Sequence, residues 1–251
     1  MHVYSPEFYN YISTGSRRSA QALIPLMRSV LPINSLLDIG AGQGAWAAEW
    51  RDAGVPDVLA VDGAYVNQDA LLIPQASFVA HDLSRPLDLS RRFDLVQSLE
   101  VAEHIDAKDA DTFVDTLAAH GDVIMFSAAV PHQGGEHHVN EQLPEYWRRK
   151  FAARGYDAFD WLRPKLRAND RVMPWYRYNT ILYANAEGQA KLAAQVLAHR
   201  VPDDTQLAVG GSLQWTIRRS VIRLMPAATI GWMATANASI QSRKFKYFSA
   251  R

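Results

Sequence analysis

Short apolar runs alternate along the chain with segments in which apolar residues recur every three or four positions. Runs typical of buried β-strands occupy residues 36–39, 58–61, 78–80, 93–99 and 122–126. Between them, residues 45–53 and 107–119 carry apolar side chains at helical spacing. Strands that alternate with helices predict an α/β fold with a doubly wound, mostly parallel sheet and helices on both faces.

The flanking segments complete the predicted architecture. Residues 156–161 and 180–184 read as two further strands, which predicts a seven-stranded sheet, and helices are expected at residues 19–31, 144–154 and 187–200. Pro32 would stop the first of these helices, and Pro144 suits the first turn of the second. We therefore expect three parts: an N-terminal helical segment over residues 1–34, a central α/β domain over 35–201 and a helical appendage over 202–251.

A glycine-rich turn follows the first predicted strand and carries the strongest chemical signal. Gly40, Gly42 and Gly44 lie between the run Leu-Leu-Asp-Ile and the next helix. Glycines allow a sharp turn and a close approach of the backbone to a ligand, and the start of a helix favours polar or anionic ligand groups. Gly40, Gly42 and Ala45 also fit the dinucleotide fingerprint, so the turn alone leaves the cofactor open.

Acidic residues stand where the following strands end. Asp62 follows Gly44 by eighteen residues, a position suited to binding both ribose hydroxyls, although Asp62 and Gly63 could also simply form a turn. Asp82 comes after the third strand, and the segment Glu-Val-Ala-Glu-His, residues 100–104, comes after the fourth. Open α/β sheets bind ligands at these carboxyl ends.

Taken together, these motifs resemble those of class I S-adenosylmethionine-dependent methyltransferases, over roughly residues 17–185. The resemblance implies a Rossmann-like methyltransferase fold, with residues 35–201 as the domain that binds S-adenosyl-L-methionine. It implies that the glycine turn holds the methionine and ribose portion, that Asp62 holds the ribose and that Asp82 lies near the adenine. The cofactor-binding residues expected on this basis are Asp38, Gly40, Ala41, Gly42, Gly44, Asp62, Gly63, Asp82, Leu83, Leu99 and Glu100.

A narrower likeness concerns the acceptor. Residues 126–131, 134–135, 138–142 and 146–147 resemble a bacterial subgroup of methyltransferase-domain proteins found near surface-glycan and secondary-metabolite genes. This resemblance implies a small-molecule or glycan acceptor. The residues expected to contact it are Glu103, Asn140, Glu141, Trp175 and Tyr176. Arg163, Arg167 and Arg171 precede the last two and form either a surface loop or a site for an anionic acceptor, such as a nucleotide-linked sugar.

Three histidines are candidates for a general base. A hydroxyl acceptor needs help to lose its proton, and histidine suits that task near neutral pH. His104 follows the fourth strand, and His137 and His138 follow the fifth. Alternatively, His104 could brace a helix start, and the segment 137–142 could order its loop. Glu136, His137, His138 and Glu141 match no firm metal-ligand spacing, so the sequence predicts no metal site.

Composition narrows the class of protein. Lysine plus arginine balance aspartate plus glutamate at 26 each, which argues against a general nucleic-acid binder. The absence of cysteine excludes disulfides, thiolate metal sites and a cysteine nucleophile. The start of the chain has no signal-peptide pattern and no run is apolar enough to span a membrane. These features predict a cytoplasmic protein; its oligomeric state stays open.

The C-terminal region has a different pattern. After a linker rich in Pro, Asp and Gly at residues 202–211, residues 212–225 combine an apolar stripe with Arg218, Arg219 and Arg223. A helix of this kind can lie on an anionic membrane surface, or it can pack on its own domain or on a partner subunit.

The prediction is thus methyl transfer from S-adenosylmethionine to a small-molecule or glycan acceptor, most often a hydroxyl, by in-line displacement with a histidine base. Two alternatives remain. One is a nicotinamide-dependent oxidoreductase that uses the same glycine turn, which Asp38 and the segment 100–104 disfavour. The other is a non-catalytic module that binds the cofactor and acts through a partner.

Overall fold

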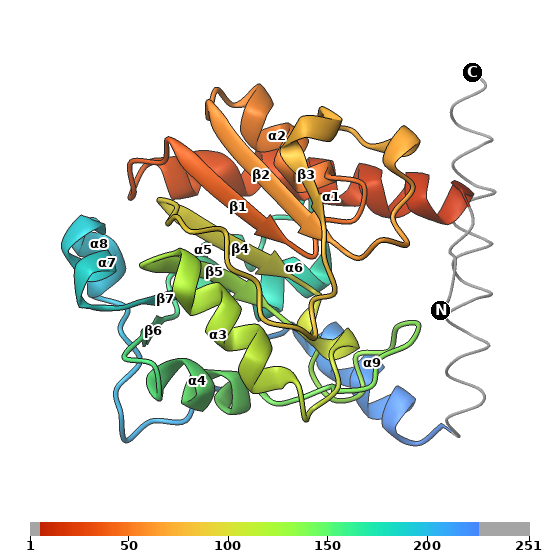
Figure 1. Cartoon of the computed structure of the whole chain (residues 1–251). Coiled ribbons are helices and arrows are strands. Elements are labelled where there is room, and N and C mark those ends of the chain that lie inside the picture. The colour runs from red at the N-terminus through yellow and green to blue at the C-terminus, as the bar shows by residue number, and fades with distance from the viewer. Residues whose placement is uncertain (1–5, 226–251) are drawn as a thin grey trace.

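A seven-stranded sheet forms the centre of the protein (Figure 1). The structure is a computed structural model that describes residues 6–225. The strands lie in the order β3-β2-β1-β4-β5-β7-β6. Their bounds are β1 Ser35–Ile39, β2 Asp57–Asp62, β3 Phe78–Ala80, β4 Leu95–Leu99, β5 Val123–Ser127, β6 Asp157–Phe159 and β7 Ile181–Ala184.

The sheet is mostly parallel, and the order in which the chain adds strands reverses beside β1. Strands β1 to β5 pair in parallel, and β7 runs antiparallel to both β5 and β6. From β1 the chain builds outward through β2 to β3, and then returns to place β4 on the other side of β1. The loops after β1 and β4 therefore diverge, which opens a crevice at the carboxyl ends of these strands.

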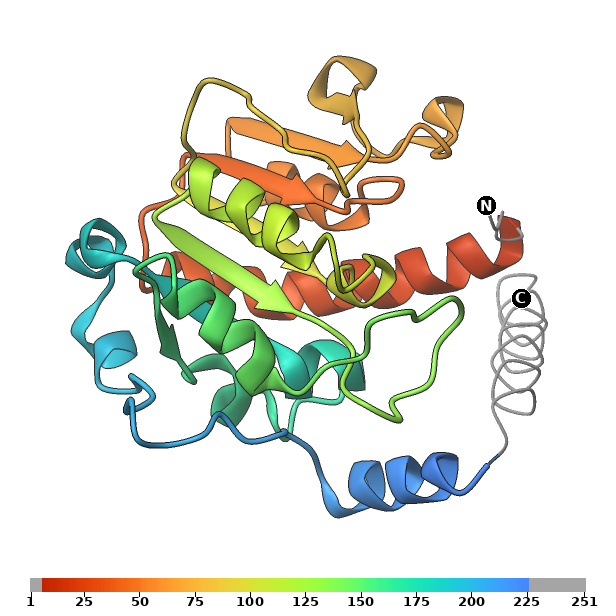
Figure 2. The same ribbon diagram turned by 60° about the horizontal axis from the view of Figure 1, so that its bottom comes forward.

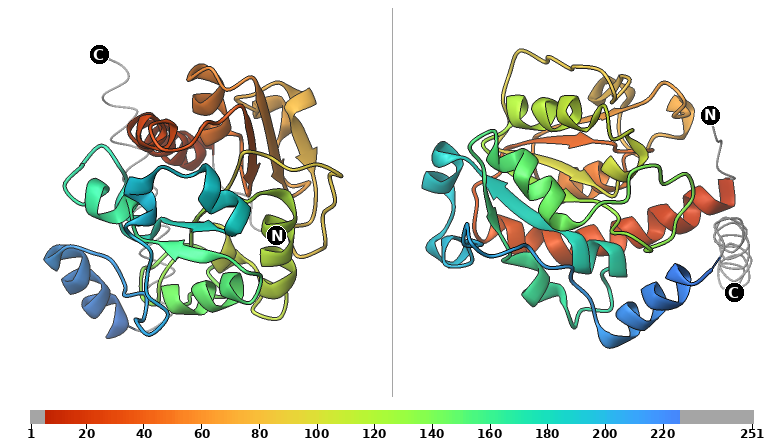
Figure 3. Two further views of the ribbon diagram at one scale, coloured as in Figure 1. Left: turned by 90° about the vertical axis from the view of Figure 1, so that its left-hand side faces the viewer. Right: turned by 90° about the horizontal axis from the view of Figure 1, so that it is seen from below.

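Helices cover both faces of the sheet (Figures 1 and 3). Apolar residues of α1 and α2 pack on one face, and those of α3 and α4 pack on the other. Over the described residues the helices are α1 Pro6–Arg28, α2 Ala45–Asp52, α3 Ala110–His120, α4 Pro144–Ala152, α5 Leu162–Leu166, α6 Pro174–Asn179, α7 Ala186–Lys191, α8 Ala194–Leu197 and α9 Leu213–Arg223. Three short 3₁₀ helices lie at Gln68–Ala70, Gln75–Ser77 and Ala102–His104.

Burial on both faces explains why the central strands read as continuous apolar runs. In β1, Leu36 packs into the layer that includes Trp50 of α2, while Leu37 packs into the layer that includes Phe113 of α3. All four of these side chains are inaccessible to solvent. A strand covered on one face only would alternate apolar and polar residues.

The predicted seven-stranded, mostly parallel α/β fold is confirmed, with differences in the helices. Residues 6–28 form one helix, which begins well before the predicted start at residue 19 and ends three residues before the predicted end at residue 31. The predicted helix at 187–200 is split, because buried Leu192 is extended and the N–H of Ala193 donates to the carbonyl of Val30. The basic and aromatic stretch at 163–176 is not one continuous loop, since α5 and α6 occupy its two ends.

The C-terminal part of the described chain lies against the domain. Arg148 of α4 donates to the carbonyls of Pro202 (2.9 Å) and Thr205 (2.7 Å), which holds the segment at 202–211 on the surface. Helix α9 follows it. Within residues 6–225, no helix combines the length and apolar character needed to cross a membrane. The start of the predicted N-terminal segment, residues 1–5, and residues 226–251 of the predicted appendage lie outside the described residues.

Candidate active site

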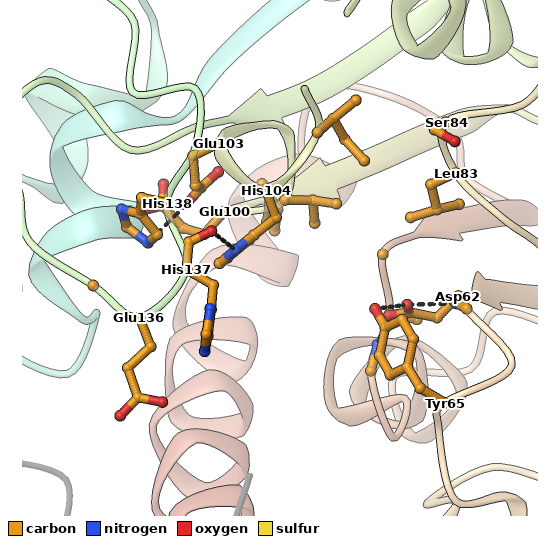
Figure 4. A pocket seen from close by; sticks show the side chains of 18 of the residues that line it. Asp62, Tyr65, Leu83, Ser84, Glu100, Glu103, His104, Glu136, His137 and His138 are labelled. Carbon is orange, nitrogen blue, oxygen red and sulfur yellow. Dashed lines mark hydrogen bonds and ion pairs between the residues drawn. The ribbon is translucent and has the colours of Figure 1, made fainter. Parts of the chain in front are cut away.

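A pocket of about 1330 Å³ opens at the carboxyl ends of the parallel strands. The loops after β1, β2, β3, β4 and β5 line it, together with residues of α1 and α6. Helix α1 extends past the sheet on this side (Figure 2), and its Ser13 and Ser16 form part of the wall. Figure 4 shows two groups of side chains facing each other across the opening, one around Asp62 and the other around Glu103 and His138.

The glycine turn after β1 has a conformation that only glycine fits. At Gly40 φ is +82°, and a Cβ atom there would lie 2.3 Å from the side chain of Val101. The Gly40 N–H donates to the carbonyl of Val61 (2.8 Å), and the Gly42 N–H donates to Oδ2 of Asp62 (2.6 Å). The turn is thereby fastened to the end of β2, and its backbone can approach a ligand closely.

Asp62 is buried at the end of β2, and both of its carboxylate oxygens have partners. Oδ2 accepts from Gly42, while Oδ1 accepts from the Gly63 N–H (2.6 Å) and from the hydroxyl of Tyr65. Burial raises the pKa of Asp62, and these hydrogen bonds oppose the rise. The Tyr65 ring lies over Gly63, where a Cβ atom would come within 2.2 Å of it. Tyr65 was not predicted from the sequence, although its place three residues after the aspartate puts it within reach.

Asp38 is a second buried carboxylate at the pocket. It is 3% exposed, and its Oδ2 has no hydrogen-bond partner among the described residues. Burial raises the pKa of Asp38 to about 7, and the nearby charge of Asp62 adds to this rise. A buried carboxylate with an open oxygen at the pocket wall can accept a hydrogen bond from a ligand, and a cationic ligand group would stabilise its ionised form.

The structure brings nearly all of the predicted cofactor-binding residues to this pocket. Gly44 is the exception, because it caps α2 and packs against Ile73 instead. Asp82 lies at the rim, where its side chain is exposed and accepts from the N–H (3.0 Å) and hydroxyl (2.8 Å) of Ser84. These two bonds lower the pKa of Asp82 and hold the loop after β3 in a tight turn. The predicted residues that line the pocket are Asp38, Gly40, Ala41, Gly42, Asp62, Gly63, Asp82, Leu83, Leu99 and Glu100.

Glu100 has a backbone conformation unusual for its residue type. Its φ is +58°, in the left-handed region that non-glycine residues rarely adopt. Its carboxylate accepts from Nε2 of Gln133 (2.6 Å) and Nδ2 of Asn179 (3.1 Å), and burial nevertheless raises its pKa. Backbone strain of this kind gathers at functional sites, where the surroundings hold it in place. Gln133 and Asn179 were not predicted, because no local pattern links them to Glu100.

On the opposite side of the pocket, two histidine rings are held by their Nδ1 atoms. Nδ1 of His138 is 2.8 Å from Oε1 of Glu141, and Nδ1 of His104 is 3.2 Å from the carbonyl of His137. The two rings meet edge to face, with centroids 5.0 Å apart. The hydrogen bond from His138 and backbone N–H groups lower the pKa of Glu141, against the effect of its partial burial. The pKa of His104 falls to about 4, because the pocket wall desolvates the ring and because His138 lies close.

Glu103 lies beneath these rings and is the most deeply buried acid of the pocket. It is 1% exposed, and its Oε2 has no hydrogen-bond partner among the described residues. Burial, and then the charge of Glu100, raise the pKa of Glu103 well above its ordinary value. Its backbone carbonyl accepts from the N–H groups of Val139 (2.9 Å) and Asn140 (3.0 Å). The loop after β4 and the loop after β5 are thereby joined.

The predicted acceptor residues fall into two groups. Glu103, Trp175 and Tyr176 line the pocket, together with the three histidines. Asn140 and Glu141 do not: Asn140 is buried and accepts from Gln142, and Glu141 stands behind His138.

The arginines of the basic stretch do not reach the pocket either. Arg163 donates to the carboxylate of Asp160 (2.7 and 2.6 Å) and to the carbonyl of Ala208 (2.7 Å). Arg167 and Arg171 are exposed and do not line the pocket. These contacts give no support to an arginine grip on an anionic acceptor.

Helix α9 supports the loop that carries His137 and His138. Arg218 donates to the carbonyl of Gln133 (2.7 Å), and Arg219 donates to that of Pro131 (3.1 and 2.8 Å). Of the alternatives for this basic helix, these contacts match packing on its own domain, since two of its three arginines bind the protein itself. The predicted apolar stripe faces solvent at Leu213, Ile217, Val221 and Leu224.

Comparison with known families decides the class of the protein. The family model described as a methyltransferase domain matches residues 12–181. The chain belongs to the methyltransferase-domain family. The expected class, an S-adenosylmethionine-dependent methyltransferase, is confirmed, and the nicotinamide-dependent alternative is set aside. The sequence matches no curated protein.

Several solved methyltransferases are similar to the chain. The magnesium protoporphyrin IX methyltransferase from Synechocystis, solved with S-adenosylmethionine, is 15% identical, with a TM-score of 0.49 over 74% of this chain and 87% of that one. A glycopeptide N-methyltransferase solved with the same cofactor is 14% identical, with a TM-score of 0.45 over 66% and 92%. An S-adenosylmethionine-dependent methyltransferase from Clostridium acetobutylicum is 19% identical, with a TM-score of 0.39 over 47% of this chain and 52% of that one. The chain therefore spans about half the length of that protein.

Proposed function

We propose that this methyltransferase transfers the methyl group of S-adenosylmethionine to a hydroxyl group of a small-molecule or glycan acceptor. Its cofactor is S-adenosylmethionine. The proposal rests on one observation: two sets of chemical groups face each other across one pocket. The glycine turn and Asp62 stand on one side, and His138, oriented by Glu141, stands on the other (Figure 4).

The cofactor would lie along the rim formed by the loops after β1 and β2. Asp62 would bind the ribose hydroxyls, which requires the Tyr65 hydroxyl to give up its place on Oδ1. The open oxygen of Asp38 suits the ammonium group of the methionine portion. With its nucleoside at Asp62, the sulfonium would point toward the side of the pocket that holds Glu103 and His138. This placement leaves the remaining volume for a compact acceptor.

The chemistry needs positioning and one proton transfer. The acceptor oxygen attacks the methyl carbon in line with the departing sulfur; a C–O bond forms, the C–S bond breaks, and the bonding pair stays on sulfur as S-adenosylhomocysteine. The acceptor proton must leave, and His138 would take it. Glu141 holds Nδ1–H of His138, which leaves Nε2 as the atom that accepts a proton. Holding both reactants in this geometry is the larger part of the catalysis.

His137 and His104 are both exposed, and they are weaker candidates for the base. His104 has a pKa of about 4, far below the operating range in which a base is most effective. His137 supplies its backbone carbonyl to His104. A carboxylate fixes the ring of His138, whereas the ring of His104 bonds to a backbone carbonyl.

Methyl transfer from labelled S-adenosylmethionine to a panel of alcohols, glycosides, phenols and amines tests this proposal. We expect O-methyl products, and a loss of kcat of about 10²–10⁴-fold in His138→Asn with little change in the affinity for S-adenosylhomocysteine. His199→Asn is the matched control, because His199 is exposed and its ring bonds to the carbonyl of Gln195 in α8, away from the pocket. Transfer to amines alone would refute the hydroxyl acceptor. Equal kcat values in His138→Asn and His199→Asn would refute His138 as the base.

The non-catalytic alternative makes a different prediction in the same assay. A module that acts only through a partner would bind S-adenosylhomocysteine yet methylate no member of the panel. The enzyme assignment predicts turnover without a partner.

A further inference from the structure

We propose that Glu103, His104 and His138 form a binding site for a divalent first-row transition-metal cation, such as Zn²⁺ or Mn²⁺. The carboxylate oxygen of Glu103 and a ring nitrogen of each histidine all lie within 4.8 Å of one another. No other group of three such residues is found in the part of the chain that the structure describes. Sequence spacing did not predict this site, because His104 and His138 come from two loops and lie 34 residues apart in the chain.

The spacing is close to that of a coordination sphere. Bonds of zinc to histidine nitrogen and carboxylate oxygen are about 2.0–2.2 Å long, so two ligand atoms can lie up to about 4.3 Å apart across one cation. The Nε2 atom of His138 is already 4.0 Å from Oε1 of Glu103. A shift of under about 1 Å in the side chains would bring all three atoms to a shared cation.

The orientation of both histidines is typical of metal ligands. A ligating histidine donates its second ring N–H to a carboxylate or a backbone carbonyl, which fixes the ring and its tautomer. Nδ1 of His138 bonds to Glu141, and Nδ1 of His104 bonds to the carbonyl of His137. Each Nε2 atom is thereby left as the ligand atom. These contacts also explain why Glu141 stands behind the pocket wall.

Glu103 supplies an independent observation. Its carboxylate is almost fully buried, lines the pocket and leaves Oε2 without a hydrogen-bond partner among the described residues. Burying a polar atom without a partner costs free energy, and at a pocket wall such an atom is placed to bind a ligand. A bound cation would satisfy it. In Figure 4 the Glu103 carboxylate lies beside the His138 ring and near His104.

Two imidazoles and one carboxylate define the class of cation. This donor set suits zinc, manganese, iron and related metals, whereas Mg²⁺ prefers oxygen ligands alone. Three protein ligands leave coordination positions open for water or for the acceptor. The role of the cation rests on the proposed function: it would bind the acceptor oxygen, lower its pKa and release its proton to solvent. His138 would then act as a ligand rather than as the base.

Titration of the purified full chain with Co²⁺, Zn²⁺, Mn²⁺ and Mg²⁺, each alone, tests the site. Calorimetry gives the stoichiometry, and the visible spectrum of bound Co²⁺ reports nitrogen and oxygen ligands. We expect one transition-metal ion per chain, bound at least about tenfold more weakly in Glu103→Gln, His104→Asn and His138→Asn. His199→Asn and Glu136→Gln are matched controls that should bind as the unchanged protein does. Because Glu103 is buried, each variant is first shown to be folded by its affinity for S-adenosylhomocysteine, and the exposed His104 gives a variant that leaves the core intact.

The outcomes separate this proposal from the proposed function. Saturable one-to-one binding that weakens in the three ligand variants supports the cation site. No saturable binding, binding of Mg²⁺ alone, or equal affinity in ligand and control variants overturns it. If chelator-treated protein still O-methylates its acceptor and depends on His138, the proposed function stands while the cation site fails. If cations bind as expected but no hydroxyl is methylated, the cation site stands and the proposed function fails.

Discussion

Replacing Asp38 by asparagine should stabilise the cofactor-free protein at high pH and weaken its binding of S-adenosylmethionine. The Asp38 carboxyl is 3% exposed, and its pKa is raised from 3.8 to about 7, chiefly by burial. Asparagine has nearly the same shape and cannot ionise. The variant therefore removes the cost of burying a charge and keeps the packing at the end of β1.

The sign and size of the effect follow from the two pKa values. Well below pH 4 the carboxyl is protonated in both the folded and the unfolded chain, so it contributes no pH dependence there. Between pH 4 and pH 7 the unfolded chain ionises while the folded chain keeps its proton, and the free energy of unfolding falls. A difference of about 3 pKa units corresponds to about 4 kcal/mol, which is the upper limit of the gain in Asp38→Asn at pH 8.

Urea unfolding at pH 4, 6 and 8 without cofactor measures this gain. We expect the stability difference between Asp38→Asn and the unchanged protein to be small at pH 4 and to grow until pH 8. Asp170→Asn, at an exposed position, serves as the control and should show no such trend. Calorimetry should show weaker cofactor binding by Asp38→Asn, because a neutral amide accepts a weaker hydrogen bond from an ammonium group than a carboxylate does. A stability difference that is equal at all three pH values would refute the raised pKa.

Three further substitutions give separate tests. Asp62→Ala should weaken S-adenosylhomocysteine binding by about 1–3 kcal/mol in calorimetry, the usual loss when a buried hydrogen-bonding group is removed; unchanged affinity would contradict the ribose assignment. Tyr65→Phe should strengthen the same binding by up to about tenfold, because its hydroxyl no longer competes for Asp62; weaker binding would make Tyr65 a ligand of the cofactor. Gly135→Ala should lower kcat and leave cofactor affinity unchanged, because a Cβ at Gly135 would lie 2.1 Å from Nε2 of His138; full activity would show that the ring position is unimportant.

The sequence predicted correctly those parts of the fold that depend on residues close together in the chain. Strands buried on both faces, such as β1 and β5, appear as uninterrupted apolar runs, and the glycine turn marks the strand that ends at the pocket. Two helix predictions were wrong. Helix α1 starts earlier than predicted, and the helix predicted at 187–200 is broken at Leu192. The break depends on a hydrogen bond between Ala193 and Val30, residues far apart in the sequence, so no local pattern could indicate it.

The same distinction holds at the site. Asp38, Asp62 and Glu103 could be located because each follows or ends a strand whose carboxyl end faces the crevice. The hydrogen-bond partners of the pocket residues could not be predicted in this way. Gln133 and Asn179 reach Glu100 from distant segments. Glu141 was expected at the acceptor and instead orients His138, because sequence spacing does not tell which side of a loop a residue faces.

A crystal structure of the protein saturated with S-adenosylhomocysteine tests the central claim most directly. We predict that the ribose hydroxyls bind Asp62, that the glycine turn follows the ligand backbone, and that the sulfur faces Glu103 and His138 across an open space large enough for an acceptor. A cofactor bound elsewhere, or a sulfur turned away from these residues, would contradict the proposed site.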